Sequence, residues 1–409
     1  MDFKAIKLAQ YTLAQTSHAL KVQVLNAMAK NLLAHSAKIL QANAIDLANA
    51  THLNSAMRER LALSESKIEA MAKSIKEIAS LPNPLGQTLK GWQTESGLDI
   101  QKVSVPIGVI GIIYESRPNV TSDSASLCFK SGNVCILKGG KEAKESNTLI
   151  AKILQNTLED FSLPKEYIST LEDYSREGVL EFIKQDQYID LLIPRGGEGL
   201  ISFVSQNATI PVLKHDKGVC HLYIHKDSKI QEAIKIVINA KTQRPSTCNS
   251  IETLLIHQEI APSLLPPLYL ALKEKGVELK VSAEVQDFIP EKLLNLQEED
   301  FHKEYGEKIL NITLVKDLQT AVDHINTYGS KHSESILTQD ISSAEKFLNE
   351  VDASCVYLNA STRLSDGGEF GFGAEIGIST NKLHARGPVG LEGLVTYKYK
   401  IYGDWQVRG

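Results

Sequence analysis

The chain has 409 residues, of which 43% are hydrophobic and 23% are charged, values typical of a globular protein with a large core. Its formal net charge of −5 shows no basic excess, which argues against nucleic acid or an anionic membrane as the main partner. Residues 1–40 carry lysines throughout and no apolar run reaches membrane-spanning length, so we expect a cytoplasmic protein without a secretion signal.

The first 80 residues predict helices. Within 64–80 the apolar residues recur at steps of three and four, and Ser66 with Glu69 predicts a capping box at the helix start. The run 81–86, which contains two prolines and a glycine, ends this helix.

Two further segments predict strands that stand apart from the main domains. Residues 89–104 have the pattern of a β-hairpin with Ser96-Gly97 near its turn. The stretch 393–408 alternates and is rich in aromatic residues, as is typical of a terminal edge strand. Because an unpaired edge of this kind promotes association, we expect a homo-oligomer.

From Pro106 onward, predicted strands and helices alternate. The first strand, 107–114, is a near-continuous apolar run, typical of a strand covered on both faces. The other predicted strands are 134–137, 188–193, 221–224, 251–256, 309–315, 335–337 and 355–358. The predicted helices are 122–129, 142–161, 228–240, 262–275, 318–328 and 342–350. This alternation predicts an α/β fold of two doubly wound domains, since the strands outnumber one average sheet.

Cys248 is the leading candidate for a catalytic residue. It lies in the polar stretch KTQRPSTCNS (241–250), directly before a predicted strand, although cysteine is normally a small buried hydrophobe. Backbone N–H groups or a nearby cation such as Arg244 would raise its thiolate fraction. The alternative is an exposed, inert thiol, and the loop alone does not decide between them.

The other four cysteines favour burial. Cys135 and Cys355 stand in apolar strand-like runs, Cys128 belongs to the inner face of a short helix, and Cys220 at the start of a strand is ambiguous. An odd total of five without a CxxC pair argues against a disulfide framework or a structural zinc site, and we expect no metal.

Three loops that follow predicted strands indicate a nucleotide site. They are Glu115–Asn119, Lys138–Lys141 and Arg195–Gly199. Open α/β sheets bind ligands at such loops, and glycine lets backbone N–H groups approach a phosphate. No GxGxxG occurs in them, so the standard dinucleotide fingerprint is absent.

The segment VPIGVIGIIYESRPNVTSDSASLCFKSGNVCILKGGKEAKESN (105–147) resembles the aldehyde dehydrogenase superfamily. Within it, four motifs resemble the family of gamma-glutamyl phosphate reductases. They are YESRPNVT (114–121), IPRGGEGLI (193–201), TQRPSTCNS (242–250) and DGGEFGFGAEIGISTNKLHARGPVGLEGLVTYKY (366–399). The resemblance covers about residues 1–405.

The resemblance implies an aldehyde dehydrogenase-like fold with three parts. A cofactor-binding domain would comprise 1–88, 105–218 and 357–390, and a catalytic domain 219–356. An oligomerisation arm would combine the hairpin 89–104 with the C-terminal strand 391–409.

The resemblance also implies a reaction: NADPH-dependent reduction of L-glutamyl 5-phosphate to L-glutamate 5-semialdehyde and phosphate, the second step of proline biosynthesis from glutamate. Cys248 would attack the acyl phosphate and hold the acyl group as a thioester. Functional coupling to the upstream glutamate kinase follows from the same assignment.

Residue roles carry over motif by motif. Asn119, with the backbone N–H of Cys248, would stabilise the oxyanion, although the superfamily's asparagine follows a Pro-Trp pair. The cofactor contacts implied are Lys138, Arg195, Gly196, Gly197 and Glu304. The spacing around Glu304 is shifted by one, and its residues alone favour a solvated charge. Candidate substrate-binding cations are Arg117, Arg244 and Arg363.

One departure bears on the chemistry. Hydrolytic aldehyde dehydrogenases carry a water-activating glutamate in an ELGGK-like run, and the comparable stretch here, 214–218, reads KHDKG. A thioester intended for hydride or phosphate should lack such a base. Asp216 is a substitute base that keeps this inference open.

Three alternatives remain. The chain could be an acylating aldehyde dehydrogenase acting on another acyl phosphate or on an acyl-CoA. It could be a non-redox cysteine acyltransferase or amidase, with His215, His221 or His384 as base. It could also be a catalytically inactive binding scaffold, whose Cys248 would not be reactive.

Overall fold

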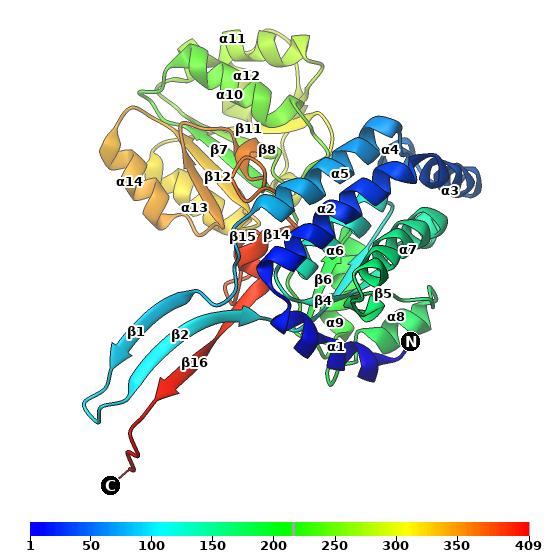
Figure 1. Cartoon of the computed structure of the whole chain (residues 1–409). Helices are drawn as coiled ribbons and strands as arrows, with labels where there is room; N and C mark the ends of the chain where they lie inside the picture. Colours follow the sequence, from blue (N-terminus) through cyan, green and yellow to red (C-terminus); the bar gives the residue numbers. More distant parts are fainter. Residues whose placement is uncertain (215–216, 409) are drawn as a thin grey trace. The chain divides into compact units, whose positions relative to one another are not determined.

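A computed structural model describes residues 1–214 and 217–408 (Figure 1). The chain divides into two compact units. The first comprises Met1–Lys214, Gly371–Gly377 and the residues from Leu383 onward. The second comprises, of the described residues, 217–370 and Ile378–Lys382. Each unit contains a parallel sheet with helices, so the predicted α/β fold with two doubly wound domains is confirmed.

The sheet of the first unit has the strand order β5-β4-β3-β6, and all its pairings are parallel. Its strands are β3 (Val109–Tyr114), β4 (Val134–Lys138), β5 (Ile168–Thr170) and β6 (Leu191–Arg195). The chain runs outward from β3 through β4 to β5 and then returns to place β6 on the other side of β3. The topological switch point therefore lies between β3 and β6, where such sheets bind ligands.

Helices α6 (Pro118–Lys130) and α7 (Lys144–Asp160) connect the first three strands of this sheet and pack against each other. The N-terminal helices α2 (His18–Ala34) and α5 (Glu65–Ser80) pack together; α2 also contacts α7, and α5 contacts α6. The remaining helices of this unit are α1 (Phe3–Gln15), α3 (Ser36–Asn49), α4 (Ser55–Leu61), α8 (Arg176–Phe182) and α9 (Glu198–Asn207). Among the described residues, no helix has the length and apolar character to cross a membrane.

The predicted capping box at the start of α5 is wrong. The helix begins at Glu65, and its N-cap is Ser64, whose hydroxyl accepts from the Lys67 N–H at 3.2 Å. Ser66 instead lies in the first turn, with its hydroxyl 2.9 Å from that of Ser64. The cap therefore forms two residues earlier than the sequence pattern suggested.

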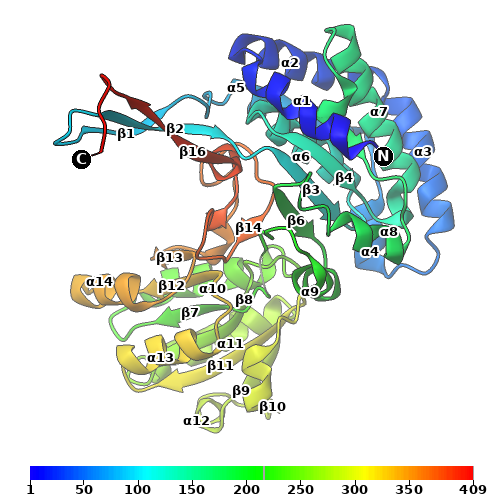
Figure 2. The same cartoon turned by 90° about the horizontal axis from the view of Figure 1, so that it is seen from below.

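The second unit is built on a seven-stranded parallel sheet with the order β10-β9-β11-β8-β7-β12-β13 (Figure 2). Its strands are β7 (Cys220–Ile224), β8 (Ile251–His257), β9 (Glu278–Val281), β10 (Leu294–Asn295), β11 (Ile309–Val315), β12 (Ser333–Leu337) and β13 (Cys355–Leu358). Its helices are α10 (Ile230–Thr242), α11 (Ala261–Glu274), α12 (Ala283–Gln286), α13 (Leu318–Tyr328) and α14 (Ile341–Glu350).

Alternation along β7 places helices on both faces of this sheet. Leu222 and Ile224 belong to the apolar cluster that includes residues of α10 and α11. Tyr223, between them, belongs to the cluster of α13 and α14. Because successive side chains of a strand point to opposite faces, the two clusters lie on opposite sides of the sheet.

A three-stranded antiparallel sheet in the first unit is formed by β1 (Thr88–Gln93), β2 (Asp99–Pro106) and β16 (Val395–Tyr402), in the order β1-β2-β16. The turn between β1 and β2 includes Gly97, whose positive φ of 84° suits glycine. The predicted hairpin and C-terminal strand therefore pair with each other. Figure 1 shows this sheet extending away from the other elements of its unit.

Several boundaries differ from the prediction. Residues 357–370 group with the second unit, because β13 pairs with β12 there. Helix α6 starts at Pro118, four residues earlier than expected, since proline suits the first helical position. The strands β5, β9 and β10 and the helices α8 and α12 carried too short a pattern to be predicted.

Two histidines of the second unit should each contribute a loss of stability in acid. Burial lowers the pKa of His324 and of His221 to about 3. An unfolded histidine protonates near pH 6.5, so the unfolded chain binds more protons below that pH. The contribution of these two neutral histidines to the unfolding free energy is complete above pH 6.5 and is lost as the pH falls toward 3.

The unfolding free energy of the wild type should fall between pH 7.5 and pH 5.5. We predict that this fall is smaller in His324→Phe by about 1 kcal/mol. Phenylalanine retains the ring contacts with Phe301 and Tyr328, both at 4.6 Å between centroids. Urea unfolding at the two pH values measures the effect. His302→Phe, an exposed site against the same Tyr328 ring, is the control. An equal acid loss in wild type and His324→Phe would contradict the assignment.

Candidate active site

Cys248 lies in a tight turn between α10 and β8. The Ser250 N–H donates to the Thr247 carbonyl at 2.9 Å, so Cys248 and Asn249 are the two central residues of this turn. A preceding turn is closed by Thr247, whose N–H and hydroxyl both donate to the Arg244 carbonyl, at 3.3 and 2.8 Å. Cys248 is half-buried, whereas the other four cysteines are buried.

Gly218 packs directly against the backbone of Cys248. A Cβ at Gly218 would overlap the carbonyl oxygen and Cα of Cys248, so only glycine fits. The Gly218 N–H donates to the Glu304 carboxylate at 2.9 Å. The Cys220 thiol donates to the Cys248 carbonyl at 3.2 Å. The predicted site residues Cys248 and Glu304 are thus brought close together through Gly218.

Arg363 and Asn249 form a reciprocal set of hydrogen bonds beside the cysteine. Arg363 Nη1 donates to Asn249 Oδ1, and Arg363 Nε donates to the exposed Gln243 Oε1 at 2.9 Å. Burial and the charge of Arg244 lower the pKa of Arg363, while the charges of Cys248 and Asp366 act in the opposite direction. Two of the predicted substrate-binding cations, Arg244 and Arg363, therefore lie near Cys248.

A buried ion pair between Lys241 and Glu252 joins the two elements that flank the Cys248 loop, α10 and β8. Lys241, predicted as part of the polar loop, belongs instead to the last turn of α10, and its Nζ lies 2.6 Å from the Glu252 carboxylate. Lys241 Nζ also donates to the Ile251 carbonyl at 3.0 Å. Burial raises the pKa of Glu252 to about 7 and lowers that of Lys241, in each case against the attraction of the partner.

The predicted cofactor residues of the first unit converge on the carboxyl ends of β3, β4 and β6. Arg195 is the last residue of β6, and Gly196 and Gly197 follow it before α9. The Glu115 carboxylate accepts from the Gly197 N–H at 2.9 Å, and the Glu115 N–H donates to the Arg195 carbonyl at 3.2 Å. A Cβ at Gly196 would collide with the Glu115 carboxyl group.

Lys138 ends β4 on the same edge of the sheet. Burial lowers its pKa, whereas the charges of Glu142 and Glu115 raise it. Glu142 accepts from the N–H and the hydroxyl of Ser116, at 2.9 and 2.6 Å. Lys138 Nζ also lies 5.6 Å from the centre of the Tyr174 ring. Glu142 and Tyr174 were not predicted as site residues, since Glu142 reads as a helix-start acid and Tyr174 follows a strand too short to predict.

Asn119 and Arg117 lie at the start of α6 in the first unit. Asn119, expected in a loop, stands in the first helical turn, and its side-chain amide donates to Asp123 at 3.1 Å. Burial raises the pKa of Asp123 to about 6, against the effects of Asn119 and Arg195. Arg117 is the residue before the helix. Asn119 and Arg117 belong to a different unit from Cys248, so their predicted roles toward it stay predictions.

The histidines proposed as bases for a non-redox alternative have other partners. His221 is fully buried, with Nδ1 3.1 Å from the Glu334 carboxylate. His384 Nε2 lies 2.9 Å from the Gly393 carbonyl oxygen in the first unit. His215 and Asp216 lie outside the described residues. Within the part of the chain that the structure describes, no group of three or more potential ligands is placed to hold a metal ion.

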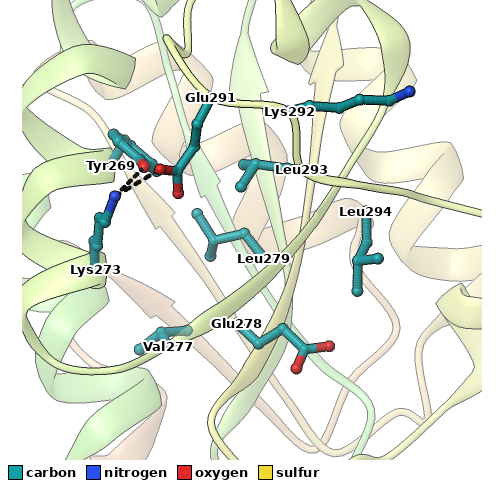
Figure 3. A pocket seen from close by; sticks show the side chains of 9 residues that line it. All are labelled: Tyr269, Lys273, Val277, Glu278, Leu279, Glu291, Lys292, Leu293 and Leu294. Atoms are coloured by element: carbon teal, nitrogen blue, oxygen red, sulfur yellow. Dashed lines mark hydrogen bonds and ion pairs between the residues drawn. The ribbon is translucent and has the colours of Figure 1, made fainter.

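A surface cavity of about 450 Å³ lies in another part of the second unit (Figure 3). Val277, Leu279 and Leu293 provide much of its apolar lining, and an ion pair of 2.6 Å joins Lys273 to Glu291 beside them. None of the lining residues is a predicted site residue, so the cavity stands apart from the candidate active site.

Comparison with known proteins places this chain in a family. The model of the aldehyde dehydrogenase family matches residues 4–286. A gamma-glutamyl phosphate reductase from Wolinella succinogenes is 58% identical over 94% of each chain. Its counterpart from Sulfurimonas denitrificans is 57% identical over 98% of each chain.

Solved structures give the same result. The crystal structure of gamma-glutamyl phosphate reductase from Thermotoga maritima superposes with a TM-score of 0.96 at 42% identity, covering 100% of this chain and 99% of its own. The chain therefore belongs to the aldehyde dehydrogenase family. Within that family it belongs with the gamma-glutamyl phosphate reductases, as the resemblance of its motifs predicted.

We predict that Gly218→Ala lowers the rate of alkylation of Cys248 by iodoacetamide at least about tenfold, because the added methyl group must displace the cysteine backbone. Mass spectrometry of the Cys248 peptide measures the rate. Gly91→Ala, where the nearest atom to a new Cβ is 3.8 Å away, is the matched control. Alkylation of Gly218→Ala at the wild-type rate would show that this contact does not position the thiol.

Proposed function

We propose that the chain reduces L-glutamyl 5-phosphate to L-glutamate 5-semialdehyde and phosphate with NADPH, the second step of proline biosynthesis from glutamate. The observation that carries the proposal is a half-buried cysteine in a turn beside two arginines, in a chain 58% identical to a protein named for this reaction. The second unit supplies the nucleophile, and the first unit binds the cofactor.

Cys248 acts as the nucleophile. Its thiolate attacks the acyl carbon, the bond to the phosphate oxygen breaks, and phosphate leaves with the bonding electron pair, which gives a thioester. NADPH, when bound by the first unit, would supply the hydride that reduces this thioester at the acyl carbon. The sulfur of Cys248 would then leave the acyl carbon, which gives the aldehyde and the free thiol. Asn119 and the Cys248 N–H stabilise the negative charge that develops on the acyl oxygen.

Arg244 and Arg363 are suited to the anionic groups of the substrate. Arg363 has five N–H donors, of which two are bonded to Asn249 and Gln243. The remaining donors suit the planar geometry of a carboxylate or phosphate oxygen pair. Arg117 is the third cation proposed for this role.

The carboxyl edge of the first sheet fits a nicotinamide dinucleotide. Gly139, Gly140, Gly196 and Gly197 place backbone without side chains next to Lys138 and Arg195. Asn147 Nδ2 is a buried donor without a partner among the described residues. The cation at Lys138 suits the 2′-phosphate that distinguishes NADP from NAD. Glu304 remains the proposed contact to the nicotinamide ribose, with its carboxylate also held by Gly218.

We expect the purified protein to oxidise glutamate 5-semialdehyde only when inorganic phosphate is present, and faster with NADP than with NAD. Phosphate is the attacking group in the reverse reaction, so its omission should abolish turnover. The rate is measured from the absorbance of the reduced cofactor in four parallel assays. NADP and NAD are each tested in the presence and in the absence of phosphate. Turnover that requires coenzyme A in place of phosphate would instead favour the acyl-CoA alternative.

Variants at two cysteines complete this test. Cys248→Ala should lower turnover about 10³-fold or more while the cofactor still binds, because the covalent route is lost. Cys355→Ala, a buried cysteine on β13, is the control and should retain activity. Loss of activity in both variants, or in neither, would contradict the role of Cys248.

We also propose that the chain is a homo-oligomer joined through the β1-β2-β16 sheet. Both outer strands of this sheet present apolar side chains to solvent, including Leu89 at 57% and Ile401 at 58% exposure. Trp92 and Tyr399 form an edge-to-face pair with ring centroids 6.0 Å apart. An exposed sheet edge with these side chains is a surface for association.

Sedimentation at micromolar concentration should therefore show an assembly larger than 45.0 kDa, the mass of one chain. Ile401→Lys with Leu89→Lys, which place charges on the two outer strands, should shift the population toward the monomer. Gln101→Lys, on the central strand β2, is the control. A wild-type protein that sediments as a stable monomer would refute the proposal.

A further inference from the structure

Asn249 uses its side chain and its backbone to tie the Cys248 turn to a second loop. Its Nδ2 donates to the carbonyls of Ser365 and Arg363, at 3.0 and 3.3 Å. Its own carbonyl accepts from the Thr362 hydroxyl at 2.7 Å. With Arg363 Nη1 on its Oδ1, Asn249 is bonded to the 362–365 loop at three of its atoms.

The local helix geometry favours a cation at this position. Helix α10 ends at Thr242, and the Ser250 hydroxyl donates to its Ala240 carbonyl at 3.2 Å, so the Cys248 turn lies at the C-terminal end of the helix. The C-terminal end of a helix carries partial negative charge, which disfavours a neighbouring thiolate. A positive side chain near the thiol offsets this effect and favours the thiolate.

Arg363 is the cation that this arrangement holds in place. Two anchors fix its guanidinium: Asn249, next to the cysteine in the chain, and Gln243, one residue beyond α10. The charges of Arg363 and Cys248 attract each other. Without Asn249, the bond to the exposed Gln243 side chain would be the one described hydrogen bond left to the guanidinium.

We infer that Asn249 is a positioning residue, which holds the Arg363 guanidinium beside Cys248 and thereby promotes formation of the thiolate. The inference deepens the proposed function and rests on Cys248 as its nucleophile. Asn249 itself need not touch the substrate, because each of its described bonds goes to the protein.

The test is the pH dependence of Cys248 alkylation by iodoacetamide, in full-length protein without substrate or cofactor. Asn249→Ala should lower the rate at pH 7 about tenfold and move the midpoint of the pH profile upward by about one unit. Arg363→Met should do the same, and the double variant should add little, since both changes remove one interaction. Asn43→Ala, which removes another buried amide with several hydrogen bonds, is the control and should leave the profile unchanged.

Gln243→Ala provides a second route, because Gln243 is exposed and its substitution does not threaten folding. It should move the profile in the same direction by a smaller amount, about two- to threefold in rate at pH 7. A wild-type profile in Asn249→Ala, or in Gln243→Ala if the first variant does not fold, would overturn the inference, as would full additivity with Arg363→Met. Because alkylation needs no substrate, its outcome is independent of which acyl phosphate the enzyme reduces.

Discussion

The contact between Gly218 and the backbone of Cys248 governs the geometry around Cys248 in the second unit. Gly218 lies two residues before β7 and Cys248 three residues before β8, and these neighbouring parallel strands pair with each other. Pairing therefore forces the two segments together at the amino ends of the strands. No side chain fits between them, so the position of the thiol is set by backbone packing, which is stiffer than a side-chain contact.

The two units use opposite ends of their parallel strands. In the first unit, Lys138 and Arg195 end their strands, in keeping with the usual location of ligands in open α/β sheets. In the second unit, the proposed nucleophile, Cys248, precedes its strand and follows the C-terminal end of a helix. The first arrangement supplies a favourable site for phosphate groups. The second has no helix N-terminus at Cys248, and in the proposed mechanism Arg244 and Arg363 supply the positive charge there.

Prediction from sequence succeeded where a pattern was long or locally complete. Helix α13 begins and ends at the predicted residues, and β11 matches its predicted range, because both carry a full apolar period. The predicted start of α6 is wrong by four residues because the pattern places Pro118 in a loop. Proline is favoured in the first turn of a helix, and α6 begins there. The sequence predicts Lys241 in a loop because a lysine in a polar stretch gives no sign of burial. Its buried partner, Glu252, lies on the next strand and is found only in the folded chain.

The sequence by itself determined the α/β alternation and the family, and it identified Cys248 as the candidate nucleophile, because these depend on local patterns and on motifs read along the chain. Tertiary structure decided which groups surround that cysteine. Gly218, Asn249 and Arg363 meet only through strand pairing and loop packing, and Arg363 follows Asn249 by more than a hundred residues. Contacts between distant segments leave no local periodicity, so only the folded chain reveals them.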